Sequence, residues 1–184
     1  MPMKRLQSGG RIDRSQPLSF RFDGKAMQGF QGDTLASALL ANDVALVGRS
    51  FKLHRPRGIV GSGAEEPNAI LQVGTGARTE PNLRATQVEL YEGLVAKTTK
   101  GWPNVRWDIG SINDVFARVF GAGFYYKTFM YPRTWWKYYE RLIRAAAGFG
   151  RAPVAADPDE YEHYNAHCDV LVAGGGPAGL IAAL

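Results

Sequence analysis

The stretch LSFRFDGKAMQGFQGDTLASALL, residues 18–40, decides the fold of the first half of the chain. Its first five residues alternate between apolar and polar side chains, which is typical of a half-buried strand. The pair Asp23-Gly24 follows, and this pair favours a two-residue turn in which both residues have positive φ. Residues 25–30 are therefore expected to return as the second strand of a hairpin.

A helix is expected directly after this hairpin. Asp33 or Thr34 provides a side-chain oxygen that can accept a hydrogen bond from a free N–H group of the first turn. Leucines and alanines then recur at helical spacing up to residue 40. Three further strands are expected at residues 69–73, 84–90 and 93–98. The sequence therefore predicts an α+β domain over residues 1–100, with a mixed sheet and one main helix packed on it.

The composition is that of a folded chain. Of the 184 residues, 45% are apolar and 21% are charged. The single cysteine, Cys168, excludes an internal disulfide and a four-cysteine metal site. We find neither a secretory leader nor a run of about 18 apolar residues, so we expect a cytoplasmic protein without a membrane partner.

Positive charge is concentrated near the N-terminus. Residues 1–60 contain ten Lys and Arg against four Asp and Glu, whereas the remaining residues contain twelve against thirteen. Many of these cations lie in GRSFKLHRPRG, residues 48–58. No nucleic-acid-binding motif accompanies them, so no nucleic acid is expected as a partner. Three roles remain open for this segment: a docking face for an acidic partner, a contact with cofactor phosphates, or a solvated surface.

Residues 101–165 differ in character from the first hundred. Ten of the 21 aromatic residues lie between residues 120 and 139, and residues 135–147 have the spacing of a helix. Aromatic residues at this density belong in a core or an interface. The core of this chain and a contact with another domain or subunit both remain possible. Residues 152–165, with two prolines and four acidic residues, are expected to be a linker.

The last segment contains a dinucleotide-binding motif. Residues 169–173 (DVLVA) are expected as a buried parallel strand, and residues 180–184 as the continuation of a helix. Between them, Gly174 permits a tight turn, Gly176 permits close approach of a pyrophosphate, and Gly179 permits close helix packing. Residues 166–184 are therefore expected to begin a Rossmann-type dinucleotide-binding domain. The candidate cofactor-binding residues are Gly174, Gly175, Gly176, Pro177, Ala178 and Gly179.

Three segments resemble one family, the α subunits of heterotetrameric sarcosine oxidases: residues 32–40, 48–58 and 168–179. The resemblance implies a β-grasp, ferredoxin-like domain at residues 1–100 and a subunit that takes part in oxidising sarcosine to glycine with formation of peroxide. It also implies NAD at the glycine loop, with FAD and FMN elsewhere in the complex. The implied partners are the β and other subunits, an amine substrate and tetrahydrofolate.

The ferredoxin-like domain departs from its cluster-binding relatives. Those relatives place three cysteines in the loop after the basic segment, which here reads GSGAEEPN at residues 61–68, and a fourth where Thr86 stands. Because all four are missing, we expect no iron–sulfur cluster and no metal ligand. This absence favours the sarcosine oxidase branch, although the α subunit of a related amine or opine oxidoreductase remains an alternative.

No side chain in the sequence is a convincing catalytic acid, base or nucleophile. His54 lies among cations and is expected to be structural. Two functions of different class therefore remain: a subunit of an oxidoreductase, inactive without its remaining parts, and a non-catalytic assembly module.

Overall fold

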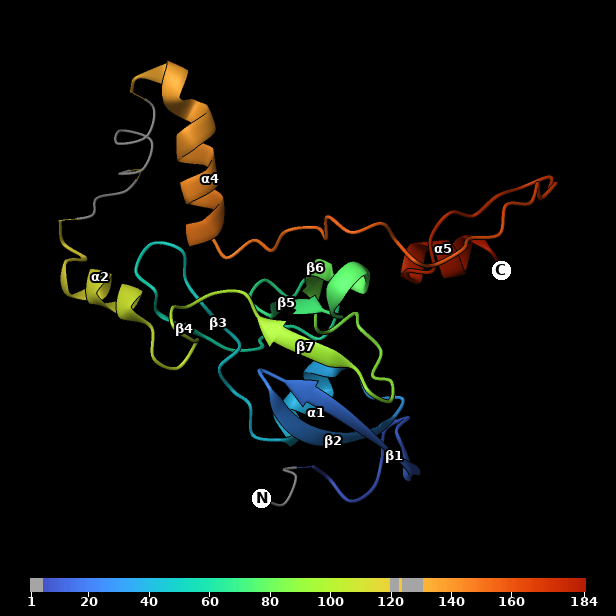
Figure 1. Ribbon diagram of the computed structural model, residues 1–184. Coiled ribbons are helices and arrows are strands. Elements are labelled where there is room, and N and C mark those ends of the chain that lie inside the picture. Colours follow the sequence, from blue (N-terminus) through green and yellow to red (C-terminus); the bar gives the residue numbers. More distant parts are fainter. Residues whose placement is uncertain (1–4, 120–122, 124–130) are drawn as a thin grey trace.

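The computed structural model describes residues 5–119, 123 and 131–184. Its main element is a five-stranded mixed sheet with the strand order β2-β1-β7-β5-β6 (Figure 1). Strand β1 pairs antiparallel with β2 and parallel with β7, and β5 pairs antiparallel with both β7 and β6. The strands are β1 (Asp13–Phe22), β2 (Lys25–Gln31), β5 (Ile70–Val73), β6 (Glu80–Arg84) and β7 (Val95–Thr98).

The predicted hairpin is confirmed. Asp23 and Gly24 have φ values of 47° and 78°, as the expected turn requires, and Phe22 pairs with Lys25 beside it. Phe20 and Phe22 alternate with exposed residues and point into the core. The other core residues come from the sheet, the helix and nearby loops, and include Leu35, Leu39, Val47, Leu71, Leu90 and Leu94.

Helix α1 (Leu35–Ala41) packs on this core. Thr34 is its N-cap and forms a capping box with Ser37, which confirms the expected helix start. The expected strand at residues 84–90 is wrong in its position, since β6 ends at Arg84. Residues 85–90 instead run past the start of α1. Their carbonyl groups at Ala85 and Val88 accept hydrogen bonds from the first N–H groups of the helix, which otherwise lack partners.

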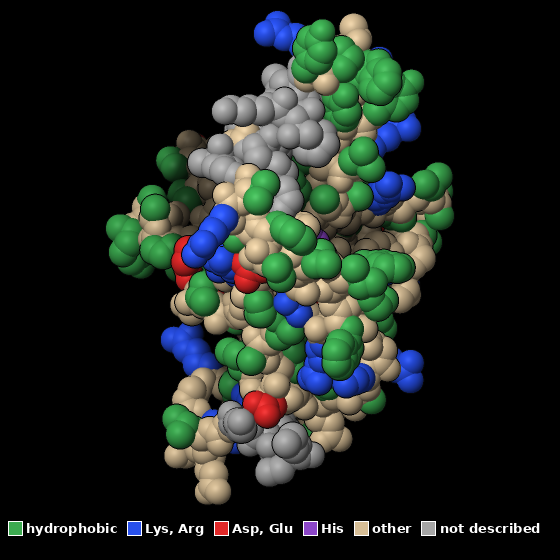
Figure 2. All heavy atoms as spheres, turned by 90° about the vertical axis from the view of Figure 1, so that its left-hand side faces the viewer, with side chains coloured by type: hydrophobic (Ala, Val, Ile, Leu, Met, Phe, Trp, Pro, Cys, Tyr) green, Lys and Arg blue, Asp and Glu red, His purple; other side chains and the backbone are tan. Residues whose placement is uncertain are grey.

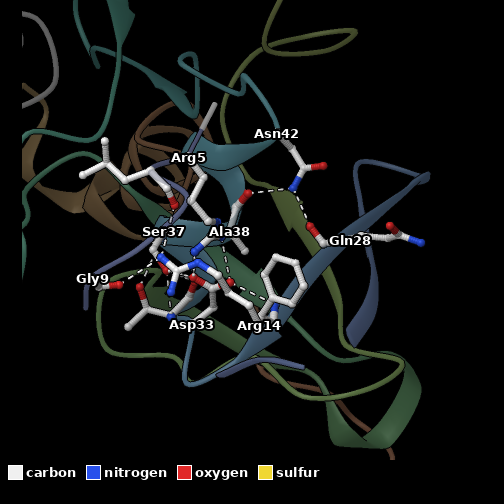
Figure 3. Close-up of polar contacts among 11 residues, drawn as sticks. Arg5, Gly9, Arg14, Gln28, Asp33, Ser37, Ala38 and Asn42 are labelled. Carbon is white, nitrogen blue, oxygen red and sulfur yellow. Dashed lines mark hydrogen bonds and ion pairs between the residues drawn. The ribbon is translucent and has the colours of Figure 1, made fainter. Parts of the chain in front are cut away.

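Arg5 joins the segment before β1 to the start of α1 (Figure 3). Its guanidinium group donates to both carboxylate oxygens of Asp33, at 2.9 and 2.8 Å. Asp33 is buried and also accepts from the Phe30 N–H group at 2.9 Å and the Ser37 hydroxyl at 2.6 Å. This single carboxylate therefore holds three segments of the chain together.

The remaining elements lie outside the sheet. Strands β3 (Gly48–Arg49) and β4 (Pro56–Arg57) form a two-stranded ribbon. The segment at residues 101–119, here called the arm, follows β7 and contains the 3-10 helix η2 (Ile109–Ser111) and α2 (Ile112–Val115). The short η3 (Arg133–Trp135) leads into α4 (Trp136–Ala146), which confirms the expected helix and stands apart from the sheet (Figure 1). The five aromatic residues from 120 to 130 all lie outside the described residues.

The expected strand at residues 169–173 is not formed. These residues have no regular structure, and Val170 and Leu171 are exposed. A buried parallel strand needs neighbouring strands and covering helices, and no β-partner lies beside these residues within the described part of the chain. The short helix α5 (Pro177–Ala182) does form after the glycines. The Rossmann-type part of the predicted fold is therefore not confirmed.

Candidate functional site

The loop between β4 and β5 is organised around one buried carboxylate. The Glu66 residue is 0% exposed. Its carboxylate accepts hydrogen bonds from the N–H groups of Val60 and Asn68, each at 2.8 Å, and of Ala69 at 3.1 Å. The N–H group of Gly61 donates to it as well. Four backbone donors from both ends of the loop therefore converge on one side chain.

The charge of Glu66 is stabilised by these donors. Burial acts to raise the pKa of the carboxyl, but the backbone N–H groups of the loop outweigh this and hold the pKa below its ordinary value. The neighbouring Glu65 is exposed and accepts from the N–H groups of Ser62 and Gly63, at 2.7 and 2.9 Å. The two adjacent glutamates thus differ mainly in burial and in the number of backbone segments that they join.

Thr86 lies against the same loop. Its hydroxyl donates to the Gly63 carbonyl at 2.7 Å, and the Arg84 guanidinium donates to the Glu66 carbonyl at 3.3 Å. Thr86 and residues 61–68, which stand where cluster-binding relatives carry their cysteines, lie together in the structure. The role of Glu66 was missed, because a carboxylate in a glycine-rich loop gives no sign of how many backbone groups will surround it.

The basic segment is used mainly within the chain. Arg49 donates to the carbonyl groups of Val105 at 2.8 Å, Arg106 at 3.0 Å and His54 at 3.0 Å. The Nδ1 atom of His54 lies 2.6 Å from the carboxylate of Asp108. These side chains therefore fasten the arm to the ribbon of β3 and β4.

Asp108 is the centre of this contact on the arm. It is buried and also accepts from the N–H groups of Trp102 at 3.0 Å and Gly110 at 3.1 Å. Burial opposes its charge, but these N–H groups and His54 hold the pKa of the Asp108 carboxyl below its ordinary value. A more exposed ion pair, Arg55 with Asp114 at 2.7 Å, continues the same contact.

This arrangement answers one question that the sequence left open. Arg49 and His54 bind the arm of the same chain. This role differs from all three that were considered for the basic segment. Arg57, in contrast, is exposed. The interaction was not predictable, since Asp108 has no distinctive spacing relative to His54.

The glycine loop forms a turn that leads into α5. Gly174 has a φ of 116°, which side chains rarely adopt, and Gly176 is the N-cap of α5 with Pro177 in the first turn. At Gly179, a Cβ atom would overlap the carbonyl oxygen of Gly174. Gly175 precedes this N-cap, and Ala178 lies within α5. The close packing of helix and turn therefore requires glycine at residue 179.

Residues 15–101 match the family of 2Fe-2S iron-sulfur cluster binding domains. The mixed sheet, its single packed helix and this match together define the class of the domain as ferredoxin-like. Larger proteins align with almost the whole chain, including the residues that follow this domain.

The chain is homologous to the alpha subunits of sarcosine oxidase. It is 60% identical over 185 residues to the Rhizobium meliloti (strain 1021) protein of that name, covering 100% of this chain and 19% of the relative. Identity to the Corynebacterium sp. (strain U-96) subunit is 34%, covering 96% of this chain and 14% of that protein. For the strain P-1 subunit, identity is 36% over 94% of this chain and 13% of the relative. The family resemblance expected from the sequence is confirmed, and the chain spans about a fifth or less of these proteins.

One solved structure is distantly similar. L-proline dehydrogenase from P. horikoshii aligns with 47% of this chain and 16% of its own, with 21% sequence identity and a TM-score of 0.35. A likeness at this level carries no functional argument.

The expected cofactors need a correction. We expected a ferredoxin-like domain with no iron–sulfur cluster, but the family that residues 15–101 match is described as binding a 2Fe-2S cluster. That expectation is contradicted by this match.

The side chains of this chain nevertheless do not fit such a cluster. A 2Fe-2S cluster takes four protein ligands, usually thiolates, whereas residues 15–101 contain no cysteine and Cys168 is exposed far along the chain. Within residues 5–119, 123 and 131–184, no group of three His, Cys, Asp or Glu side chains is placed to hold a metal ion. In the same part of the chain, no helix is long and apolar enough to cross a membrane.

Proposed function

We propose that this chain is part of the α subunit of a multisubunit sarcosine oxidase. The observation that carries the proposal is the 60% identity to the Rhizobium meliloti subunit over the full length of this chain. In the proposed reaction, sarcosine, oxygen and water yield glycine, formaldehyde and hydrogen peroxide. Two electrons and two protons pass from the methylamine group to oxygen, and water hydrolyses the resulting imine.

Within that subunit, we propose three parts. Residues 1–100 form the ferredoxin-like domain, residues 101–165 form an interface segment, and residues 166–184 begin a dinucleotide-binding domain. The Glu66-centred loop and the ribbon that Arg49 and His54 fasten to the arm support a structural role for the first part. Residues Gly174–Gly179 would contact the phosphates of a dinucleotide, a role supported by the tight turn and by the packing at Gly179.

The activity is tested with the full-length subunit coexpressed with its partner subunits. Oxygen consumption, formaldehyde and peroxide are measured with sarcosine, and in parallel with L-proline and an opine. The proposal requires sarcosine-dependent release of formaldehyde and peroxide in equal amounts. Turnover of proline or an opine without turnover of sarcosine would instead identify the alternative, a related amine oxidoreductase.

The glycine loop is tested in the same complex with Gly176→Val. A valine side chain blocks the approach of a pyrophosphate to the backbone. On denaturation, the variant complex should therefore release much less dinucleotide than the wild-type complex. The circular dichroism of the variant should match that of the wild type. Retention of an equal amount of dinucleotide by the variant would show that this loop does not bind it.

A further inference from the structure

Helix α4 and the turn before it present three distinct faces. Tyr139, Ile143 and Ala147 recur at intervals of four residues and are half-buried. Trp135, Tyr138 and Leu142 recur at intervals of three and four residues and form a second face, here called the aromatic stripe. These three side chains are 56%, 67% and 64% exposed. The aromatic stripe is therefore open to solvent, although it is apolar.

The aromatic stripe is ordered by its own contacts. The rings of Trp135 and Tyr138 meet edge to face with their centroids 6.5 Å apart. Figure 2 shows apolar side chains gathered at the top of this view, with Lys and Arg side chains around them. Contiguous exposed apolar surface of this kind marks an interaction site in soluble proteins, and Trp and Tyr are the residues that contribute most to binding.

The third face carries positive charge. Lys137, Arg141 and Arg144 follow at intervals of four and three residues, and all three are exposed. The single carboxylate in the helix, Glu140, pairs with Arg144 at 2.7 Å. A partner that covers the stripe would therefore bring acidic residues to this side.

We propose that the aromatic stripe binds an apolar surface bordered by carboxylates on the part of the same polypeptide beyond residue 184. The inference rests on the proposed function, since it takes this chain as part of a longer subunit. The relatives support it: this chain spans 19% of the Rhizobium protein and 13–14% of the others. Residues 149–176, here called the tether, contain no helix or strand and connect α4 to α5. A tether of this length gives the attached surface a high effective concentration.

Hydrogen exchange in the full-length subunit tests the proposal, with the peptide that covers residues 133–147 as the reporter. The proposal requires slow exchange in the subunit alone, unchanged by dilution, by addition of the partner subunits or by vesicles of anionic lipid. Protection that appears only with partner subunits, only at high concentration or only with vesicles would assign the stripe to another subunit, a second copy or a membrane, and would overturn the proposal.

Paired variants show whether the stripe itself makes the contact. Tyr138→Gln and Leu142→Gln keep a residue that favours helices but remove apolar contact, and each should speed exchange of the peptide about tenfold or more. Val154→Gln is the control, because Val154 is fully exposed in the tether. Equal exchange in all three variants and the wild type would overturn the proposal. Because exchange is measured without substrate, this outcome is independent of whether sarcosine is turned over.

Discussion

The Nδ1 atom of His54 lies 2.6 Å from the Oδ2 atom of Asp108, a residue fifty-four positions further along the chain. The contact joins the β3–β4 ribbon to the arm. A Cβ atom at Gly110 would overlap the His54 ring, so the imidazole lies directly against the arm backbone. His54 itself has a φ of 51°, which is uncommon for a residue with a side chain.

Replacing this histidine should loosen the arm. His54→Ala leaves the buried Asp108 carboxylate with only backbone donors, and we expect a loss of about 1–2 kcal/mol in the free energy of unfolding. Urea denaturation of the 184-residue chain measures it. His163→Ala is the control, because His163 is exposed in the tether. Equal stability of the two variants would show that the contact with Asp108 contributes nothing.

The Glu66-centred loop provides a second prediction. In Glu66→Gln, one amide oxygen replaces two carboxylate oxygens, and the new NH₂ group faces backbone donors. We expect the free energy of unfolding to fall by about 3 kcal/mol. Glu65→Gln is a matched control one residue away, since Glu65 is exposed, and it should change the urea midpoint much less. The prediction is wrong if the two substitutions have the same effect.

The same carboxylates predict how stability depends on pH. The pKa values of Glu66 and Asp108 are below their ordinary values in the folded chain, so the unfolded chain binds more protons near pH 4. The stabilisation is complete above the unfolded pKa and is lost as the pH falls through the folded pKa. The urea midpoint should therefore vary little between about pH 7 and pH 5 and decrease below about pH 4.

Glu66→Gln serves as the control for this titration. Because the glutamine does not ionise, the decrease in the urea midpoint below about pH 4 should be smaller in this variant than in the wild type. Parallel curves for the two proteins would assign the acid sensitivity to other carboxyl groups.

The contact of Arg5 with Asp33 provides a fourth prediction. Arg5→Ala removes both hydrogen bonds of the guanidinium group and leaves the Asp33 carboxylate buried. We expect a loss of about 3 kcal/mol in the free energy of unfolding, because an uncompensated buried charge is costly. Arg11→Ala, at an exposed residue before β1, should be close to neutral. A neutral Arg5→Ala would mean that water replaces the guanidinium group.

The parts of the fold that local chemistry decides were predictable. The hairpin follows from Asp23 and Gly24 alone, and the start of α1 follows from the side chain of Thr34. The misplaced strand at residues 84–90 shows the limit of such reasoning. Those residues have strand-like composition, but the free N–H groups of α1 bind their carbonyl groups once the helix is packed beside them.

The site was less predictable than the fold. The sequence associated Thr86 with the loop at residues 61–68, but the importance of Glu66 depends on backbone groups that converge only in the folded loop. The contact of His54 with Asp108 depends on the path of the arm after β7. The strand expected at residues 169–173 depends on neighbouring strands that this part of the chain does not supply.

The position of β7 in the sheet has a consequence for synthesis on the ribosome. Although β7 is the last of the five strands in sequence, it lies between β1 and β5, and it is the only link between the hairpin and the β5–β6 pair within the described sheet. The nascent chain can close its first hairpin early, but the two halves of the sheet cannot join until Thr98 has left the exit tunnel. Until then, β1, which carries Phe20, and β5, which carries Leu71, both lack β7 beside them. A translational pause once Thr98 has emerged would therefore give this domain time to close while the residues that follow it are still inside the tunnel.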